Sequence, residues 1–125
     1  MPRMKFQTLT EQMYYILLCL NSECCGIDIM DRITAMTNGR VVVGAGTLYN
    51  LLEQFLEVEM IRETKREGRR RSYVLTKTGR EALDAERRRL WDQIGDYDRV
   101  FGEEGACEMT SEAVPSGLQP GCQRG

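Results

Sequence analysis

The chain of 125 residues contains no histidine, and its five cysteines include no Cys-x-x-Cys pair. Structural zinc usually takes four Cys or His ligands at characteristic spacings, and these cysteines do not supply them: Cys19, Cys24, Cys25, Cys107 and Cys122. Without histidine, a ligand cluster or a nucleophile beside a base, the sequence offers no constellation for acid–base or covalent catalysis. We therefore expect no enzyme, no metal site and no cofactor.

Long apolar runs are also missing, since none approaches the roughly 20 residues that a membrane-spanning helix needs. No signal peptide is evident at the N-terminus. We expect a cytoplasmic protein with reduced thiols and no membrane partner. At this length a single small domain with a modest core is the expectation, and oligomerisation is a natural source of further stability.

An overall excess of positive charge is absent too, because the formal net charge is −2. The charges are unevenly distributed, however. Residues 102–125 hold four glutamates against one arginine, whereas basic residues cluster between Arg62 and Arg80. Since the local potential governs binding to an anionic partner, the net charge does not exclude nucleic acid.

The segment that organises the chain begins with a predicted helix from Gly46. Its apolar residues recur at helical spacing and form one face that must pack against a core: Leu48, Leu51, Leu52 and Phe55. The outward face begins with the neutral polar residues Thr47 and Asn50 and becomes acidic at Glu53 and Glu57. Only the first turn of this helix suits an approach to DNA.

After the helix, the pattern predicts a β-hairpin with a basic tip. The runs Ile61–Lys65 and Arg70–Leu75 are extended, and residues 66–68 break them. Five cations lie on this hairpin: Lys65, Arg66, Arg69, Arg70 and Arg71. A helix feeding directly into such a hairpin is the layout of a winged helix-turn-helix, in which the helix start meets base edges and the wing meets phosphates.

Less specific interpretations of the same features stay open. A run of arginines is often a solvated strand face, and a leucine stripe is often only core. The acidic residues Glu53 and Glu57 and the negative net charge favour an alternative function, a winged-helix module for protein association without DNA binding.

Two further helices are predicted ahead of this segment. Thr8 and Glu11 have capping-box spacing, which predicts a first helix from about Thr8 to Leu20. The second is predicted over Gly26–Thr37 and ends at Asn38-Gly39, because both residues tolerate positive φ. Its inward residues are expected to be Ile29, Met30, Ile33 and Met36.

The segment between the second and third helices is β-branched and short. Arg40–Val43 is predicted to be the strand that completes a three-stranded wing sheet. Gly44 and Gly46 then let the backbone approach something closely, either the sugar-phosphate chain at the positive end of the third helix or simply the chain's own turn.

The last helix is predicted to run from an N-cap at Thr76 to Phe101. Its roughly 39 Å length is too great for a domain this small to cover. An apolar stripe with 4,3 spacing, interrupted by Arg87, predicts a seam with a partner helix: Leu83, Leu90, Ile94, Tyr97 and Phe101. Tyr14 and Leu18 of the first helix either face that partner or broaden the buried face of one monomer.

Two separated elements carry a resemblance to a known family. Gly46-Thr47-Leu48-Tyr49, followed at this distance by Gly68-Arg69-Arg70-Arg71-Ser72-Tyr73-Val74-Leu75-Thr76, resembles the PadR family of bacterial transcriptional regulators. The family usually has glycine where Glu59 stands and an aromatic residue where Ser72 stands. The resemblance implies a homodimeric repressor that binds double-stranded DNA.

The resemblance also implies roles for individual residues. Thr47, Tyr49 and Asn50 would approach the groove, and a basic set would contact phosphates: Lys65, Arg66, Arg69, Arg70, Arg71 and Lys77. Family members often respond to small aromatic or hydrophobic effectors. Trp91, the one tryptophan, is the candidate effector-binding residue, and packing of a dimer interface is its alternative role.

The predicted fold is mainly α with a small β-hairpin wing. We expect a winged helix-turn-helix DNA-binding domain over residues 1–75 and a long C-terminal dimerisation helix over residues 76–101. The tail from Gly102 to Gly125 is acidic and rich in Gly, Pro and Ser, so we expect it to be disordered.

Overall fold

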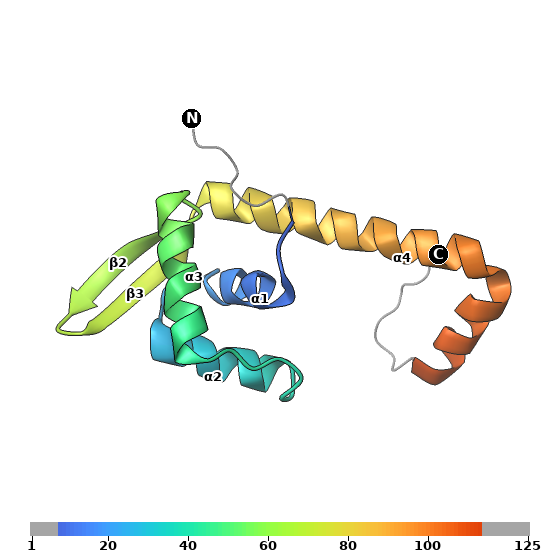
Figure 1. Cartoon of the computed structure of the whole chain (residues 1–125), viewed down its shortest axis with the longest axis horizontal. Coiled ribbons are helices and arrows are strands. Elements are labelled where there is room, and N and C mark those ends of the chain that lie inside the picture. Colours follow the sequence, from blue (N-terminus) through green and yellow to red (C-terminus); the bar gives the residue numbers. More distant parts are fainter. Residues whose placement is uncertain (1–7, 114–125) are drawn as a thin grey trace. The chain divides into compact units, whose positions relative to one another are not determined.

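The structure is a computed structural model that describes residues 8–113 and the side chains of residues 8–102. The chain divides into an N-terminal unit, Met1–Arg87, and a C-terminal unit, Arg88–Gly125. Its elements in chain order are α1 (Glu11–Cys19), β1 (Cys24–Cys25), α2 (Gly26–Met36), α3 (Ala45–Glu57), β2 (Ile61–Glu67), β3 (Arg70–Leu75) and α4 (Lys77–Ala113). Four helices and a small antiparallel sheet confirm the predicted winged-helix class (Figure 1).

The core of the N-terminal unit is built from the inward faces of all its elements. Its most deeply buried side chains, each at most 2% exposed, are Ile16, Leu17, Leu20, Ile29, Ile33, Leu48, Leu52, Phe55, Met60, Ile61 and Tyr73. Burying one such aliphatic or aromatic side chain contributes roughly 1.5–3 kcal/mol. The first turns of α4 join this core through Ala82 and Leu83, so the unit extends past the predicted boundary at residue 75.

The first helix begins two residues later than predicted. Thr10, not Thr8, is the N-cap: its hydroxyl oxygen accepts a hydrogen bond from the Met13 N–H at 3.2 Å, and the Met13 sulfur accepts one from the Thr10 N–H at 3.4 Å. The capping box therefore has a methionine at its third helical position, where the Thr-x-x-Glu pattern expects glutamate.

The predicted strand over Arg40–Val43 is wrong. The third strand is β1, which pairs antiparallel with β3 through Cys24 opposite Tyr73, and the sheet order is β1-β3-β2. Val41 and Val43 are instead buried at 4% and 3% exposure and anchor the loop before α3, while Val42 is exposed. Met36, which was predicted to face inward on α2, is 52% exposed, so that prediction is also wrong.

Helix α2 ends at Met36, and Asn38-Gly39 terminates it as predicted. Both residues have positive φ, 56° and 82°, and the Gly39 N–H donates to the Thr34 carbonyl at 2.8 Å. Helix α3 ends in the same manner. The Glu59 φ is 63°, and the Met60 N–H donates to the Phe55 carbonyl at 2.9 Å. Glu59 thus takes the left-handed conformation that glycine adopts without steric cost.

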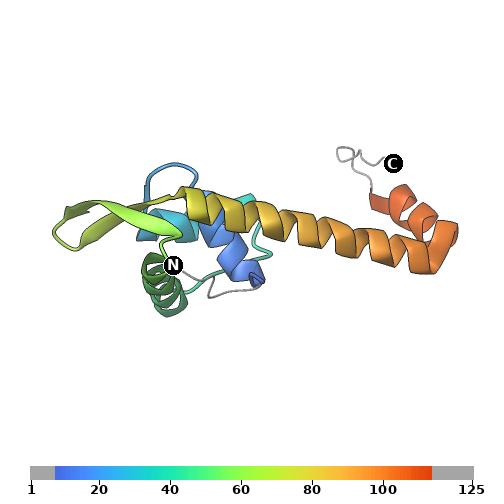
Figure 2. The same cartoon turned by 90° about the horizontal axis from the view of Figure 1, so that it is seen from above.

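The wing is the β2–β3 hairpin, and it projects beyond α1, α2 and α3 (Figures 1 and 2). Strand β2 continues to Glu67, past the predicted break, so only Gly68 and Arg69 form the turn, with Gly68 at φ 64°. A register shift between Glu63 and Lys65 marks a β-bulge, which adds bend and twist to the wing.

Helix α4 starts at the predicted N-cap, because the Thr76 hydroxyl accepts a hydrogen bond from the Gly79 N–H at 3.1 Å. The helix is interrupted at Gly102 (φ 67°, ψ −158°) and resumes to Ala113, where we had expected no regular structure. The remainder of the predicted disordered tail, residues 114–125, lies outside the described residues. Within residues 8–113, no helix is long and apolar enough to span a membrane.

Candidate nucleic-acid interface

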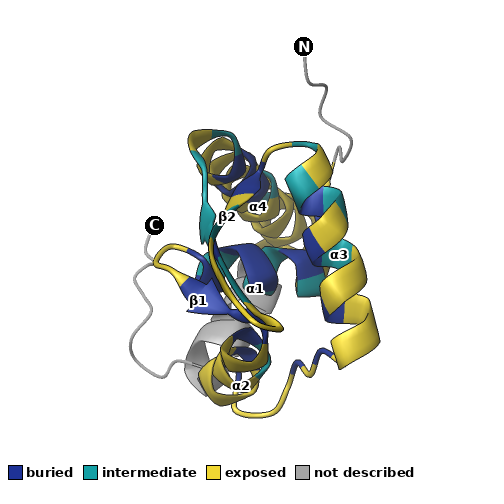
Figure 3. Ribbon diagram, turned by 90° about the vertical axis from the view of Figure 1, so that its left-hand side faces the viewer, coloured by how far each residue is buried: buried dark blue, intermediate teal, exposed yellow. Residues whose placement is uncertain are grey.

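Helix α3 is fixed along one face and open along the other. Leu48, Leu52 and Phe55 are fully buried, so the helix cannot rotate without exposing them. The opposite side of its first turns carries Thr47 and Asn50, both exposed. Figure 3 shows buried and exposed stretches alternating along α3, as one covered and one open face require. The sequence thereby presents two small hydrogen-bonding side chains at the start of a rigidly held helix.

The N-terminus of α3 is accessible to an anion. Gly44 is the N-cap and supplies no side-chain hydrogen bond, so the first N–H groups of the helix have no capping side chain. A Cβ atom on Gly44 or Gly46 would meet nothing within 4 Å. Packing within the chain therefore does not require glycine at these positions, whereas close approach of another backbone would. The helix dipole adds partial positive charge at the same place.

Tyr49 links this turn to helix α2. Its ring lies over Gly26, the first residue of α2, where a Cβ atom would collide with the tyrosine hydroxyl. The side chain nevertheless stays 41% exposed. Tyr49 is thus held between the starts of α2 and α3, beside Thr47 and Asn50 in the sequence.

The wing cations are divided between two faces of the hairpin. Arg66 pairs with Arg71 across the strands, while Lys65 pairs with Ser72 and Glu67 with Arg70. Because successive strand residues point to opposite faces, Arg66 and Arg71 share one face and Lys65 and Arg70 share the other. Lys65, Arg66 and Arg70, together with Arg69 in the turn, are exposed.

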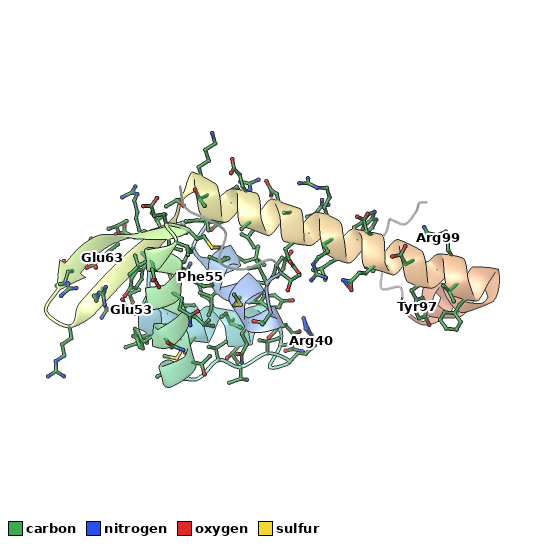
Figure 4. The ribbon with its side chains drawn as sticks, turned by 45° about the horizontal axis from the view of Figure 1, so that its top comes forward. Arg40, Glu53, Phe55, Glu63, Tyr97 and Arg99 are labelled. Atoms are coloured by element: carbon green, nitrogen blue, oxygen red, sulfur yellow. The ribbon has the colours of Figure 1, made fainter. Side chains whose placement is uncertain are left out.

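Arg71 differs from the other wing cations because it binds two carboxylates. Its Nη1 lies 3.2 Å from Glu53 Oε2 of α3, and its Nη2 and Nε lie 3.0 and 3.3 Å from Glu63 Oε1 of β2. Figure 4 shows Glu53 and Glu63 where α3 meets the wing. Arg66 also donates to Glu63, at 3.1 Å. These hydrogen bonds, first from Arg66 and then from Arg71, lower the pKa of Glu63, and the bond to Glu63 raises the pKa of Arg71.

The sequence did not predict roles for Glu53 and Glu63 in this arrangement. The usable signal was strand alternation, which separates Arg71 from Arg70 and turns it toward the buried face that contains Tyr73. Sequence reasoning had instead grouped all five wing cations together.

Lys77 lies away from the first turn of α3. With Leu56, Arg62 and Thr76 it borders an open groove of about 470 Å³ at the C-terminal end of that helix. Leu56 follows Thr47 by nine residues, which corresponds to about 14 Å along the helix axis. The structure therefore does not bring Lys77 together with Thr47 and Asn50.

The described cysteines are buried and not arranged as a metal site. Burial raises the pKa of the Cys19 and Cys24 thiols, and the Cys25 sulfur donates to Asp28 Oδ2 at 3.4 Å. Among the described residues, no group of three Cys, Asp or Glu side chains is placed to hold a metal ion.

The predicted seam residues fall into two groups. In the C-terminal unit Leu90, Ile94, Tyr97 and Phe101 are exposed, and the Tyr97 and Phe101 ring centroids are 4.7 Å apart. Trp91 in the same unit is 62% exposed. In the N-terminal unit the predicted seam residues are more covered: Leu83 is buried at 7%, and Tyr14 and Leu18 are half-buried beside a pocket of about 290 Å³.

Comparison with known proteins adds independent information. The model of the transcriptional regulator PadR-like family matches residues 16–85. No curated protein matches the chain. Similar solved structures include a transcriptional regulator from Clostridium thermocellum, with 22% identity, coverage of 72% of this chain and 91% of that one, and a TM-score of 0.60.

Two other solved structures resemble the chain to a similar extent. A PadR-like transcription factor from Bacteroides fragilis is 24% identical over 71% of this chain and 87% of its own, with a TM-score of 0.56. A PadR family transcription regulator from Clostridium difficile is 18% identical over 70% of this chain and 95% of its own, with a TM-score of 0.52. At these identities the structures support the fold.

Proposed function

Because the chain belongs to the PadR-like family of transcriptional regulators, we propose that it binds duplex DNA through the first turn of α3 and the exposed cations of the wing. Membership places it among regulators of transcription and not among enzymes. The proposed interface is supported by one observation. Thr47 and Asn50 are exposed to solvent on a helix whose other face is fully buried, and an exposed basic hairpin follows that helix.

The contacts divide by chemistry. Thr47 and Asn50 have hydroxyl and amide groups that would read base edges in the major groove, and Tyr49 would approach the groove beside them. Lys65, Arg66, Arg69 and Arg70 supply phosphate contacts from the wing. Arg71 and Lys77 are not assigned phosphates, because the first is bound to two carboxylates and the second lies at the far end of α3.

We propose a homodimer as the binding species. In the C-terminal unit four large apolar side chains are exposed at the 4,3 spacing of a helix seam: Leu90, Ile94, Tyr97 and Phe101. A two-fold dimer would place two copies of α3 on two half-sites, so the operator would be pseudo-palindromic. Such a dimer would act as a repressor by occupying a promoter.

Regulation by a flat apolar molecule is proposed for Trp91. On a helix it lies about 100° around the axis from Leu90, at the border of the seam and 62% exposed. In a dimer, two such indoles would line a shared apolar site. Quenching of tryptophan fluorescence by flat aromatic compounds, together with loss of DNA binding, would support this role. If Trp91→Ala instead produces monomers and no compound changes the wild-type fluorescence, the indole is a packing residue.

The alternative of a protein-association module is weakened by one contact. Its main support was the acidic outer face of α3, but Glu53 is paired with Arg71 within the chain. That carboxylate is therefore neutralised locally and presents less charge to a partner.

The direct test is the salt dependence of the affinity for a random-sequence duplex pool, with binding measured by fluorescence anisotropy. The log–log slope of affinity against salt changes by roughly 0.9 for each phosphate contact. Arg70→Ala should reduce the slope by about that amount. Arg80→Ala is the matched control, since Arg80 is equally a surface arginine but is paired with Asp84 at 3.2 Å on α4. Absence of any binding at low salt would contradict the proposed function.

A further inference from the structure

Arg71 joins the wing to helix α3 through its side-chain hydrogen bonds. It spans from Glu53 on α3 to Glu63 on β2 with three hydrogen bonds of 3.0 to 3.3 Å. Its guanidinium carbon also lies 5.4 Å from the centroid of the Tyr73 ring, and that ring is fully buried. The guanidinium is thus held by the recognition helix, the neighbouring strand and the core together.

The exposure of Arg71 agrees with this arrangement. Its side chain is 26% exposed, whereas that of Arg66, its cross-strand neighbour, is 59% exposed. To reach a phosphate, Arg71 would have to leave both carboxylates, and the two glutamates would then face the same polyanion unpaired. The electrostatic gain from one phosphate contact would be offset by two repulsive carboxylates.

The wing is also tied down near its bulge. Thr64, which lies at the register shift in β2, donates from its hydroxyl to Glu23 Oε2 at 2.6 Å. The hairpin is therefore bent by the bulge and held at mid-length by Thr64, while Arg71 connects it to α3. Beyond these contacts the tip, at Gly68 and Arg69, is exposed.

We propose that Arg71 is a positioning residue that sets the wing against the recognition helix, so that selectivity among DNA sequences depends on the Glu53–Arg71–Glu63 bridge. This inference rests on the proposed function. Base contacts from α3 and phosphate contacts from the wing must form on one duplex at the same time. A mobile wing would still bind phosphates through its charge, but it would no longer hold α3 in the position that base contacts require.

The bridge has a second consequence for α3. Glu53 follows Asn50 by three residues and therefore lies one turn along on the neighbouring surface of the helix. An unpaired carboxylate there would repel the phosphates that flank the groove. Arg71 neutralises it, so the same guanidinium orients the wing and removes a repulsive charge from the proposed reading face.

The test uses the full chain with two duplexes of equal length. One is a duplex that the wild-type protein enriches from a random pool, and the other is its scrambled sequence. Arg70→Ala, the phosphate control, should weaken both duplexes by a similar factor and lower the salt slope by about 0.9. Arg71→Ala should leave the slope unchanged and reduce the preference for the selected duplex about fivefold or more.

A conservative variant separates positioning from charge. Arg71→Lys keeps a cation that can meet a phosphate, but a single ammonium cannot reproduce the fork that reaches both carboxylates. If Arg71 acts by positioning the wing, Arg71→Lys should lose the preference for the selected duplex nearly as much as Arg71→Ala does. Glu63→Gln should lose preference as well, although it removes a negative charge and so raises the affinity for both duplexes.

Hydrogen exchange without DNA reports on the wing itself. In Arg71→Ala and Arg71→Lys, amides of residues 66–71 should exchange faster, while those of Leu48 to Phe55 in the core stay protected. Loss of protection everywhere would show only global unfolding, and Arg71→Lys then decides the matter as the milder variant.

Two outcomes overturn the inference. One is an Arg71→Ala salt slope reduced as much as that of Arg70→Ala, with full rescue by lysine; the other is an unchanged preference in Glu63→Gln with unchanged exchange of the wing amides. Failure of the proposed function looks different, because the wild-type protein would then enrich no duplex and bind neither probe.

Discussion

A Cβ atom on Gly79 would collide with the backbone carbonyl oxygen of Met60. That carbonyl also accepts a hydrogen bond from the Thr76 N–H at 3.0 Å, so the start of β2 lies directly against the first turn of α4. Because the obstacle is backbone, relief requires the two elements to separate. We predict that Gly79→Ala lowers the free energy of unfolding by about 1–3 kcal/mol, measured by urea denaturation.

Gly95→Ala is the matched control for that substitution. Gly95 is also helical, but the nearest atom to its added Cβ is the far end of the Arg99 side chain at 3.9 Å. There the exchange should raise helix stability by up to about 1 kcal/mol. Equal effects of the two substitutions would show that Gly79 is not pressed against β2.

Glu59 gives a prediction of opposite sign. It holds φ at 63° at the end of α3, a conformation that costs an L-residue about 1 kcal/mol or more. We predict that Glu59→Gly raises the melting temperature, because relief of the backbone strain adds about 1 kcal/mol to the free energy of unfolding. The greater freedom of glycine in the unfolded chain offsets part of this gain. Glu59→Ala removes the carboxylate but keeps the Cβ atom and therefore the backbone strain. An equal rise in melting temperature in Glu59→Ala would show that loss of the charge, and not relief of strain, stabilises the protein.

The sequence predicted the structure correctly where helical periodicity alone determines which residues are buried. Leu48, Leu52 and Phe55 fall on one helical face at any tertiary arrangement, so the buried side of α3 and its exposed start were predictable. The strand assignment failed for Arg40–Val43 because β-propensity does not say which sheet edge is available. The edge of β3 is taken by Cys24–Cys25, a strand of two residues too short to produce a pattern.

The site shows the same division. Exposure of Thr47, Asn50 and most wing cations follows from local patterns. The pairing of Arg71 with Glu53 does not, because it joins residues on two elements whose relative placement is set by the core between them. Sequence reasoning therefore could not distinguish Arg71, which is paired with Glu53 and Glu63, from the exposed wing cations.

The pH dependence of stability tests the bridge without DNA. Hydrogen bonds from Arg66 and Arg71 hold the pKa of Glu63 below its ordinary value, and Glu53 faces the same guanidinium from α3. A lowered folded pKa means that ionised Glu63 stabilises the fold above the unfolded pKa of about 4.3, and that this is lost as pH falls through the folded value.

Thermal melts of wild type and Glu63→Gln should therefore differ most near pH 7. The difference should shrink as the pH is lowered below about 4, where the wild-type carboxylate takes up its proton. A difference that stays constant from pH 7 to pH 3 would mean that the charge of Glu63 does not contribute to stability.

The apolar stripe of the C-terminal unit predicts the oligomeric state. Ile94 is 52% exposed at the middle of the stripe, so Ile94→Glu should weaken self-association at least about tenfold in sedimentation equilibrium. Arg88→Glu introduces the same carboxylate about 120° around the helix from Ile94 and should leave the assembly unchanged. A wild-type protein that sediments as a monomer at all concentrations would refute the seam.

Selection from a random-sequence duplex pool is the measurement that tests the central claim most directly, since it asks whether the first turn of α3 reads bases. We predict that the wild-type protein enriches a two-fold symmetric motif, that Asn50→Ala changes the preferred base at one position in each half-site, and that Arg70→Ala lowers the yield without changing the motif. Enrichment of no motif, or of the same motif by the wild-type protein and Asn50→Ala, would contradict the assignment of α3 as the recognition helix.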